Sequence, residues 1–254
     1  MASERLNHLK PSPWVGEHAH RYEVVLPFVA PTDHILDIAT GEGYGAAQMA
    51  EQAQSGRVIG ADADMEALAL AQAIYKSKSN LVFQREDASR LSFADNSFDK
   101  IISFETLKHV TDYEAMLYEL RRVLKPGGKL ILSTPNFPIN SPTGVVTNPY
   151  HVKEFTLEEL EVIMPNYFDA VQFWGQAYSR FDEKSPRIRK TLKGFESILY
   201  QRGVRKLPLG LKNALSKALT GRPHYPEARD YALVSDRKRI RTCKTILVFA
   251  EKHA

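Results

Sequence analysis

The chain has 254 residues, of which 43% are hydrophobic and 25% are charged, and this composition is typical of an ordinary globular protein with a full core. No window approaches the ~18 apolar residues that a membrane-spanning helix needs, and residues 1–14 lack the apolar core of a signal peptide. The lone cysteine, Cys243, cannot form an internal disulfide, and its place in an apolar run suggests a packed strand residue. These features argue against an integral membrane protein and predict a cytoplasmic one.

The first strong signal along the chain is an apolar strand, 34–38, that runs directly into a glycine-rich turn. The turn contains Gly41, Gly43 and Gly45, and a helix is expected behind it. Because glycines lack Cβ atoms, they can adopt positive φ and let main-chain N–H groups approach a ligand at the mouth of a parallel sheet. The turn therefore predicts a ligand site.

The second expected strand, 57–62, ends in an acid that narrows the ligand class. Asp62 follows Gly41 by 21 positions, the spacing expected for a carboxylate that binds two ribose hydroxyls. Gly41, Gly43 and Ala46 also satisfy the dinucleotide pattern G-x-G-x-x-G/A, so this spacing leaves both a dinucleotide and another ribose-bearing cofactor open.

Two acids near the glycines favour S-adenosylmethionine over a dinucleotide. Asp37 lies inside the first strand and Glu42 inside the turn, where negative charge would repel a pyrophosphate but suit an amino-acid group next to a sulfonium cation. A third strand, 81–84, leads to Asp87, which could accept a hydrogen bond from the amine of adenine. Glu86 beside it could do the same.

Helices and strands alternate along the rest of the chain, which is typical of a doubly wound α/β sheet with helices on both faces. One helix is expected over 112–124, starting from a capping box formed by Thr111 and Glu114 and stopped by Pro126-Gly127-Gly128. The other expected elements are helices over 46–54 and 65–76, a fourth strand from Phe98, a fifth strand over 129–134, a helix from a second capping box (Thr156 with Glu159) to about Met164, and strands over 169–174 and 242–251.

These segments, in this order, resemble the class I S-adenosylmethionine-dependent methyltransferases over about residues 15–176 and again in the last strand. The resemblance rests on the glycine turn, Asp62, Asp87-Ala88, Phe98-Asp99 and Val123–Leu130. It implies an α/β fold with a doubly wound, Rossmann-like sheet of seven strands, mostly parallel, whose last strand is antiparallel. It also implies three regions: an N-terminal helical cap segment (1–33), the cofactor domain (34–176 and 242–254), and a basic helical insertion (177–241) with helices near 187–200 and 209–219.

Three shorter segments resemble a subgroup that is often associated with bacterial glycan biosynthesis. These segments are Glu17–Tyr22, Ser133–Asn136 and Asn148–Phe155. The narrower resemblance implies O-methylation of a hydroxyl on a sugar, a glycan precursor or another small polar metabolite.

The wider resemblance also implies which residues bind S-adenosylmethionine. Arg21 could pair with the carboxylate of the methionine part, and Tyr22 or Tyr44 could lie near the sulfonium, although core packing explains both tyrosines equally well. The full expected set is Arg21, Tyr22, Asp37, Ala39, Gly41, Gly43, Tyr44, Asp62, Ala63, Asp87, Ala88 and Phe104.

Transfer of a methyl group to a hydroxyl is mostly a matter of alignment, but the acceptor must also lose its proton. His109, just after the fourth strand, is the first candidate for the general base, and packing or helix capping is the alternative. His151, in the loop after the fifth strand, is the second candidate, with Tyr150 and Asn136 as acceptor-binding partners. A loop histidine that satisfies backbone groups is the alternative for His151.

The segment from Glu105 to His109 bears on metal use. Some related O-methyltransferases have Glu-x-x-Glu-His here and hold a divalent metal with those three side chains, whereas this chain has Lys108 in the middle. An ammonium group would repel Mg²⁺ but could replace its charge beside Glu105 or a developing alkoxide. The pattern predicts metal-independent catalysis; the alternative is a Lys108 that points to solvent.

Charge is distributed unevenly along the chain. Residues 1–179 carry 15 Lys/Arg and 23 Asp/Glu, and residues 180–254 carry 19 and 7. The basic end is explained by a solvated face. It is explained equally by an anionic glycan acceptor or by a peripheral contact with acidic membrane headgroups. Nucleic acid is disfavoured because no aromatic-interleaved basic stripe is present. The alternatives to a glycan methyltransferase are an NAD(P)-dependent oxidoreductase, a cofactor-binding module without methyl transfer, and an RNA methyltransferase.

Overall fold

The computed structural model describes residues 12, 14–178, 208, 210–214 and 225–253. The chain divides into two compact units, the larger formed mainly by Arg21–Gln176 with Leu233–Ala254, and the smaller by Asn7–His20 with Ala177–Ala232. The expected helix near 187–200 lies outside the described residues. Of the expected helix over 209–219, the described residues 210–214 are helical.

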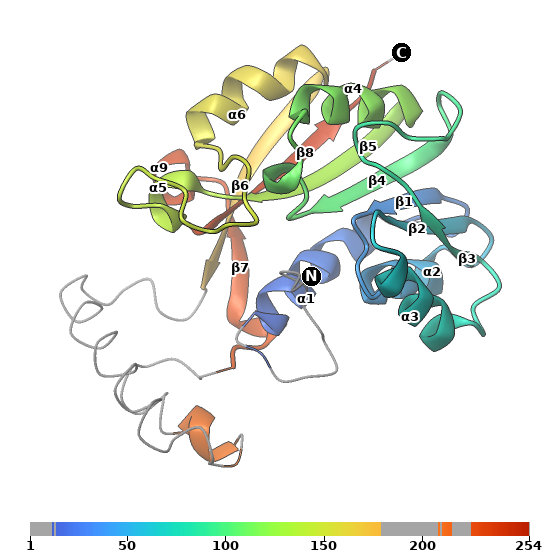
Figure 1. Ribbon diagram of the computed structural model, residues 1–254, viewed down its shortest axis with the longest axis horizontal. Helices are drawn as coiled ribbons and strands as arrows, with labels where there is room; N and C mark the ends of the chain where they lie inside the picture. The colour runs from blue at the N-terminus through green and yellow to red at the C-terminus, as the bar shows by residue number, and fades with distance from the viewer. Residues whose placement is uncertain (1–11, 13, 179–207, 209, 215–224, 254) are drawn as a thin grey trace. The chain divides into compact units, whose positions relative to one another are not determined.

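The larger unit is built on a sheet with the strand order β3-β2-β1-β4-β5-β8-β6-β7 (Figure 1). Neighbours among β1 to β5 are parallel, while β8 is antiparallel to both β5 and β6. The predicted fold class, a doubly wound and mostly parallel α/β sheet with an antiparallel last strand, is therefore confirmed. The strands are β1 His34–Ile38, β2 Arg57–Asp62, β3 Leu81–Arg85, β4 Phe98–Phe104, β5 Leu124–Pro135, β6 Ala170–Tyr178, β7 Tyr231–Val234 and β8 Thr245–Glu251.

The sheet has eight strands rather than the predicted seven. The additional strand, β7, forms at the sheet edge within the stretch that the sequence predicts as a helical insertion. All four of its residues are half-buried. A strand of this length places only two residues on each face, which is too few for hydrophobic alternation to identify it in a sequence.

Strand β5 begins at Leu124, five residues earlier than predicted. Its early part contains Gly127 at φ +75°, and its pairing with β4 shifts in register between Phe98 and Lys100. Pro126-Gly127-Gly128 does stop the preceding helix, as expected. Gly127, with its positive φ, therefore lies at an irregularity inside the strand and not in a separate turn.

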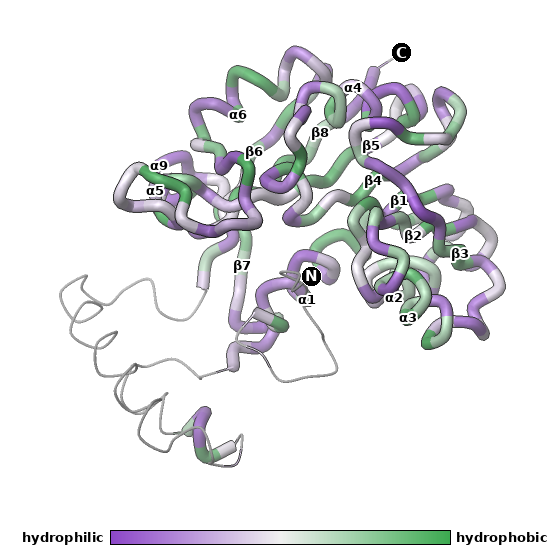
Figure 2. The backbone as a smooth tube through the Cα atoms, viewed as in Figure 1, coloured by the Kyte–Doolittle hydropathy of each residue, from purple (hydrophilic) through white to green (hydrophobic). Residues whose placement is uncertain are grey.

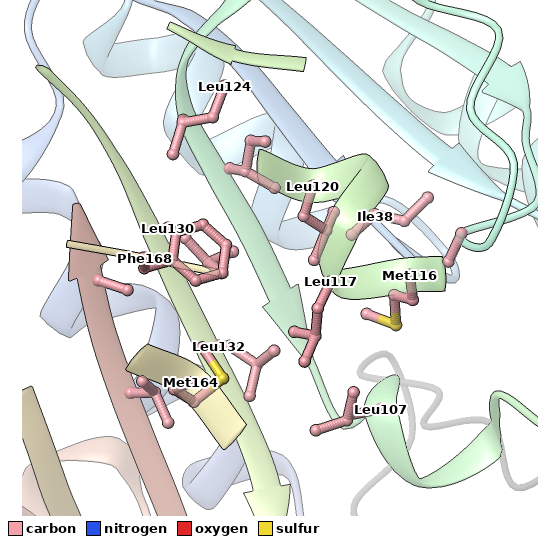
Figure 3. Packing of buried hydrophobic residues seen from close by; sticks show 14 of the residues in the cluster. Ile38, Leu107, Met116, Leu117, Leu120, Leu124, Leu130, Leu132, Met164 and Phe168 are labelled. Carbon is pink, nitrogen blue, oxygen red and sulfur yellow. The ribbon is translucent and has the colours of Figure 1, made fainter. Parts of the chain in front are cut away.

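Helices cover both faces of the sheet, and each face has its own hydrophobic cluster. Under α4 and α6, side chains such as Leu117, Leu120 and Leu132 pack together (Figure 3). On the other face, Tyr22 and Val25 pack with residues of α2 and of the strands. Figure 2 shows the hydrophobic stretches of the central strands. The helices and 3-10 turns are α1 Val15–Val25, η1 Leu26–Phe28, α2 Tyr44–Gln52, α3 Met65–Tyr75, η2 Leu107–His109, α4 Tyr113–Val123, α5 Phe137–Asn140, α6 Leu157–Ile163, η3 Met164–Asn166, η5 Ala228–Asp230 and α9 Arg237–Ile240.

One of the two predicted capping boxes is present. Thr156 accepts a hydrogen bond from the N–H of Glu159, and Glu159 accepts one from the N–H of Thr156, at the start of α6. The box predicted from Thr111 and Glu114 is wrong, because Asp112 caps α4 instead. Aspartate is at least as good a cap as threonine, so moving the cap by one residue does not lower the stability of the helix.

Cys243 is buried, as predicted, but it lies in the turn before β8 rather than in the strand. A Cβ atom added to Gly175 would lie 2.6 Å from its sulfur, so Cys243 packs directly on β6. Within the described part of the chain, none of the helices has the length and apolar character needed to cross a membrane.

Candidate functional site

The site predicted from the sequence lies at the carboxyl ends of β1 and β4. These two strands are neighbours, yet the chain proceeds from β1 to β2 on one side and from β4 to β5 on the other, and such a switch point leaves a crevice where ligands bind in α/β sheets. Ala39 and Glu105, which directly follow the two strands, have φ of +60° and +59°. Non-glycine residues in this region are strained, and such strain clusters at functional sites.

The glycine turn opens on the same side. Gly41 has φ +57°, and a Cβ atom added there would meet nothing within 4 Å. Gly43 has φ +78°, but a Cβ atom there would lie 2.5 Å from the ring of Phe83. Gly41 therefore leaves space above the turn for a ligand, whereas Gly43 permits close packing of the turn on β3.

Asp62 joins the end of β2 to this turn. One carboxylate oxygen accepts a hydrogen bond from the N–H of Gly41 at 2.9 Å, and the other accepts one from the N–H of Asp64 at 2.9 Å. A carboxylate has about four acceptor positions, so these two bonds orient the group and are compatible with binding ribose hydroxyls as well. The structure thus brings together the glycine turn and the acid that the sequence pairs with it.

Asp37 supports the turn from beneath. It is completely buried, and it accepts hydrogen bonds from the hydroxyl of Thr40 at 2.6 Å and from that of Tyr22 at 3.2 Å. Burial, opposed by these hydrogen bonds, raises the pKa of Asp37 to about 7. Because this carboxyl is partly neutral near pH 7, the electrostatic argument against a pyrophosphate rests on Glu42 more than on Asp37.

The two tyrosines expected near the sulfonium are packed together. The ring of Tyr22 lies edge-on to Tyr44 and to Phe104, with centroids 4.9 Å apart in both pairs. A Cβ atom on Gly45 would lie 1.9 Å from the Tyr22 ring. Burial raises the pKa of Tyr22 and of Tyr44, so both hydroxyls stay protonated. This geometry favours core packing for Tyr22.

At the expected adenine position, the structure distinguishes two adjacent acids. Asp87 is exposed, and its hydrogen bonds from the hydroxyl and N–H of Ser89 lower its pKa. Glu86 is buried and accepts hydrogen bonds from Gln84 and Ser92. Asp87 is therefore the acid that can reach a ligand. Of the other residues expected here, Ala63 is exposed and Ala88 is buried.

Two cations flank the carboxylate of Glu105. The Lys108 ammonium lies 3.1 Å from one oxygen, and the Arg21 guanidinium lies 3.6 Å from the other. Ser133 donates a hydrogen bond to Glu105 at 2.9 Å, and Arg21 donates one to Gln176 at 2.9 Å. Lys108 and Arg21 are both buried, so the interpretation of Lys108 as a solvent-facing residue is wrong.

The two candidate bases lie side by side, with ring centroids 5.4 Å apart. Nδ1 of His109 lies 2.7 Å from the carbonyl oxygen of Tyr150, and Nδ1 of His151 lies 2.6 Å from a carboxylate oxygen of Glu154. Asn136, expected near the acceptor, is instead buried and donates to backbone carbonyls in the turn before β8, such as that of Cys243 at 2.9 Å.

Sequence reasoning missed several supporting residues, chiefly Thr40, Ser133, Gln176 and Glu154. Glu154 and Thr40 had a local signal, because each lies three positions from its partner, His151 and Asp37 respectively. The others meet their partners only after the sheet forms. Within the described residues, no three His, Cys, Asp or Glu side chains come together in a way that could hold a metal ion.

Comparisons with known proteins match the part of the chain that contains this site. The methyltransferase-domain family Methyltransf_11 matches residues 36–132. A probable S-adenosylmethionine-dependent methyltransferase of Mycolicibacterium smegmatis is 32% identical over 152 residues, covering 59% of this chain and 57% of that protein. The ubiquinone/menaquinone biosynthesis C-methyltransferase UbiE of Haemophilus ducreyi is 27% identical over 186 residues, covering 71% of each. The YcgJ protein of Bacillus subtilis has a TM-score of 0.61 at 19% identity, covering 93% of this chain and 100% of that structure.

Residues 36–132, which include the glycine turn and Asp62, are similar to a methyltransferase domain, and the Mycolicibacterium relative is named for the cofactor S-adenosylmethionine. The residues present fit this cofactor, because the turn at Gly41 is open and carries an anchored carboxylate, Asp62, beside it. The chain spans 57% of the length of the Mycolicibacterium relative.

Proposed function

We propose that this protein transfers a methyl group from S-adenosylmethionine to a hydroxyl of a sugar, a glycan precursor or another small polar metabolite, without a metal and with a histidine as general base. The observation that carries the proposal is the position of His109 beyond the end of β4, next to His151 and one residue after the buried Lys108. A base is needed by a hydroxyl acceptor, and this edge of the sheet is where an acceptor should lie.

The cofactor supplies a methyl group on a positively charged sulfur. In this proposal, Asp62 accepts hydrogen bonds from the ribose hydroxyls, Asp87 accepts one from the adenine amine, and the turn at Gly41 lets the main chain approach the cofactor. Arg21, which forms a cluster with Glu105, contributes positive charge that attracts the methionine carboxylate. Tyr22 and Asp37 position the turn from beneath.

The proton of the acceptor hydroxyl passes to Nε2 of His109 as the new C–O bond forms and the C–S bond breaks. General-base catalysis of this kind contributes roughly 10²–10⁴-fold. In this proposal the Lys108 ammonium, which pairs with Glu105, adds positive charge to the site and lowers the free energy of the developing alkoxide. An ammonium in this position takes over the charge that a metal would supply, so the reaction as proposed needs no metal.

A second candidate reaction is C-methylation of an apolar ring that carries a hydroxyl. One relative, UbiE of Haemophilus ducreyi, is named as a C-methyltransferase. The loop that carries His151 also exposes apolar side chains, with Val145 63% and Val152 54% exposed. In this reaction His109 would remove the ring hydroxyl's proton and the methyl group would go to carbon.

The proposed acceptor can be anionic, because basic side chains gather near the end of the chain. In the described part, Arg237, Lys238 and Arg241 are exposed on or next to α9, and Arg237 and Arg241 also pair with Glu161 and Glu158. A phosphate-bearing glycan, or acidic headgroups met by a peripheral contact, would be attracted to such charge. Nucleic acid stays disfavoured as a partner.

Calorimetric titrations with S-adenosylmethionine and with NAD(H), followed by assays with labelled cofactor, test the proposal. We expect binding of S-adenosylmethionine and not of NAD(H), and label transfer to sugars, nucleotide sugars or glycan precursors. Label transfer only to quinol-like rings favours the C-methylation candidate, and transfer only to RNA replaces both. Cofactor binding without transfer to any of these acceptors favours a binding module without catalysis.

A further inference from the structure

The two histidines belong to a longer hydrogen-bonded chain that ends at a buried carboxylate. His151 binds Glu154 through Nδ1 at 2.6 Å, and Glu154 accepts a hydrogen bond from the hydroxyl of Ser141 through its other oxygen at 2.8 Å. The side chains of His151 and Glu154 are only 7% and 3% exposed. A buried carboxylate with these two partners fixes the position of the loop that carries it.

Asn148 determines which nitrogen of His151 carries the proton. The amide oxygen of Asn148 accepts a hydrogen bond from the N–H of Tyr150 at 3.0 Å, so its NH₂ group faces Nε2 of His151 at 3.1 Å. An NH₂ group is a donor, and therefore Nε2 of His151 is an acceptor. The proton on Nδ1 of His151 is directed at Glu154.

The proton of His109 can be placed in the same way, and its position bears on catalysis. Its Nδ1 lies 2.7 Å from the carbonyl oxygen of Tyr150, and a carbonyl oxygen can only accept. Nδ1 therefore carries the proton, and Nε2 of the neutral ring carries the lone pair. This is the tautomer that a general base needs if Nε2 faces the acceptor.

The loop that carries Tyr150 is held at two places. The N–H groups of Val152 and Lys153 donate to the carbonyl of Lys108 at 2.7 and 3.3 Å, which ties the loop to the η2 turn that contains His109. Within the loop, Glu154 anchors the ring of His151.

We infer that Glu154, acting through His151, is a positioning residue that fixes His109 with its proton on Nδ1 and its lone pair on Nε2. Of the two candidate bases, this assigns proton transfer to His109 and a supporting role to His151. The use of the lone pair in catalysis rests on the proposed function, whereas its location on Nε2 does not.

Nitrogen NMR of protein labelled in its histidine rings tests this inference without any acceptor. The chain has 8 histidines, and His109→Asn and His151→Asn assign the two relevant sets of signals. At a pH above ~8, where an ordinary imidazole is neutral, we expect the wild-type signals of both residues to show a protonated Nδ1 and an unprotonated Nε2. In Glu154→Ala, the His109 signals should move toward a mixture of tautomers. Glu154→Gln keeps an acceptor oxygen for Nδ1 of His151 and should restore the wild-type pattern.

Glu158→Ala is the matched control, because Glu158 is an exposed glutamate that binds Arg241 rather than either histidine. His151→Phe is the second test variant, since it keeps a ring beside His109 and removes both nitrogens. Thermal melting shows whether each variant is folded, and with an acceptor in hand Glu154→Ala should lower kcat by about 10- to 100-fold while the KM for S-adenosylmethionine changes little.

A wild-type His109 with its proton on Nε2 overturns the inference. So does a His109 signal that is unchanged in folded Glu154→Ala and in His151→Phe. These outcomes leave cofactor binding by the wild-type protein intact, whereas absence of that binding overturns the proposed function and leaves the tautomer assignment standing.

Discussion

The carboxylate of Asp62, at the end of β2, accepts a hydrogen bond from the backbone N–H of Gly41, in the turn after β1, at 2.9 Å. The ligand-binding turn and the acid are thus a single unit, although 21 positions separate them in the sequence. The second oxygen of Asp62 is fixed by the N–H of Asp64. One side chain therefore sets the shape of the turn and directs negative charge into the crevice.

Replacement of Asp62 should separate these two contributions. Asp62→Ala should weaken S-adenosylmethionine binding by about 10- to 100-fold or more, since each hydrogen bond to a charged group contributes ~1.5–3 kcal/mol. Asp62→Asn keeps an acceptor for the N–H of Gly41, so it should bind better than the alanine variant and less well than wild type. Calorimetry measures both affinities. Asp95→Asn, at an exposed surface pair with Arg122, is the control. Unchanged affinity in folded Asp62→Ala would remove this residue from the site.

The glycines of the turn should differ in what they contribute. Gly41→Ala strains the backbone by ~1–2 kcal/mol but meets no neighbour, so its main effect should be weaker cofactor binding. Gly43→Ala carries the same strain and adds an overlap with the ring of Phe83, which costs a further ~1–3 kcal/mol. Denaturant unfolding should show the larger loss of stability in Gly43→Ala. Equal unfolding free energies for the two variants would contradict the packing described for Gly43.

The raised pKa of Asp37 gives the fold a dependence on pH. An aspartate that titrates near 4 when unfolded and near 7 when folded binds more protons in the folded state between these values, so stability falls as pH rises through that window. Asp37→Asn cannot ionise and should lack this dependence, while its amide can still bond to Tyr22 or Thr40. Relative to Asp37→Asn, the wild type should lose up to ~1.4 kcal/mol per pH unit between about pH 4 and pH 7. Urea unfolding across this range measures the difference, and parallel curves for the two proteins would be the contrary result.

Local sequence signals predicted the parts of this site that adjacent residues create. The strand before Gly41, the spacing to Asp62 and the capping box at Thr156 depend on neighbours within a few positions or on a spacing that the fold repeats. The burial of Asp37 was not predictable in this way, because its partner Tyr22 comes from a helix 15 positions earlier. The sequence pattern of an acid inside a strand is the same whether its side chain faces a ligand or the core.

The same reason explains the errors elsewhere in the chain. Strand β7 is too short to show a period, and Asp112 and Thr111 are both residue types that cap helices. Lys108 is buried because Glu105 is held in place by Ser133 of the neighbouring strand. A sequence shows that a lysine replaces an acid at this position, but only the packed sheet shows that its charge stays inside the protein.

This buried charge leads to a prediction about metals. We expect a chelator to leave methyl transfer by the wild-type protein unchanged. Lys108→Met should lower kcat, because it removes the ammonium beside Glu105 that the proposal assigns to the developing alkoxide, and added Mg²⁺ should not restore the rate. Lys78→Met, which breaks a surface pair with Glu51, is the control. Loss of turnover with a chelator and recovery with Mg²⁺ in the wild type would show that the reaction does use a metal.

The assignment of the base predicts unequal effects for the two neighbouring histidines. His109→Asn should lower kcat by roughly 10²–10⁴-fold and change the KM for S-adenosylmethionine little, because the base acts on the acceptor. The rise in rate with pH that a histidine base produces near neutrality should disappear in this variant. His151→Asn can still donate to Glu154 from its amide, so it should retain more activity and the same form of pH dependence. His253→Asn, at an exposed position near the end of the chain, is the control. A larger loss in His151→Asn than in His109→Asn would transfer the role of base to His151, since both variants keep a polar side chain at nearly the same place in the loop network.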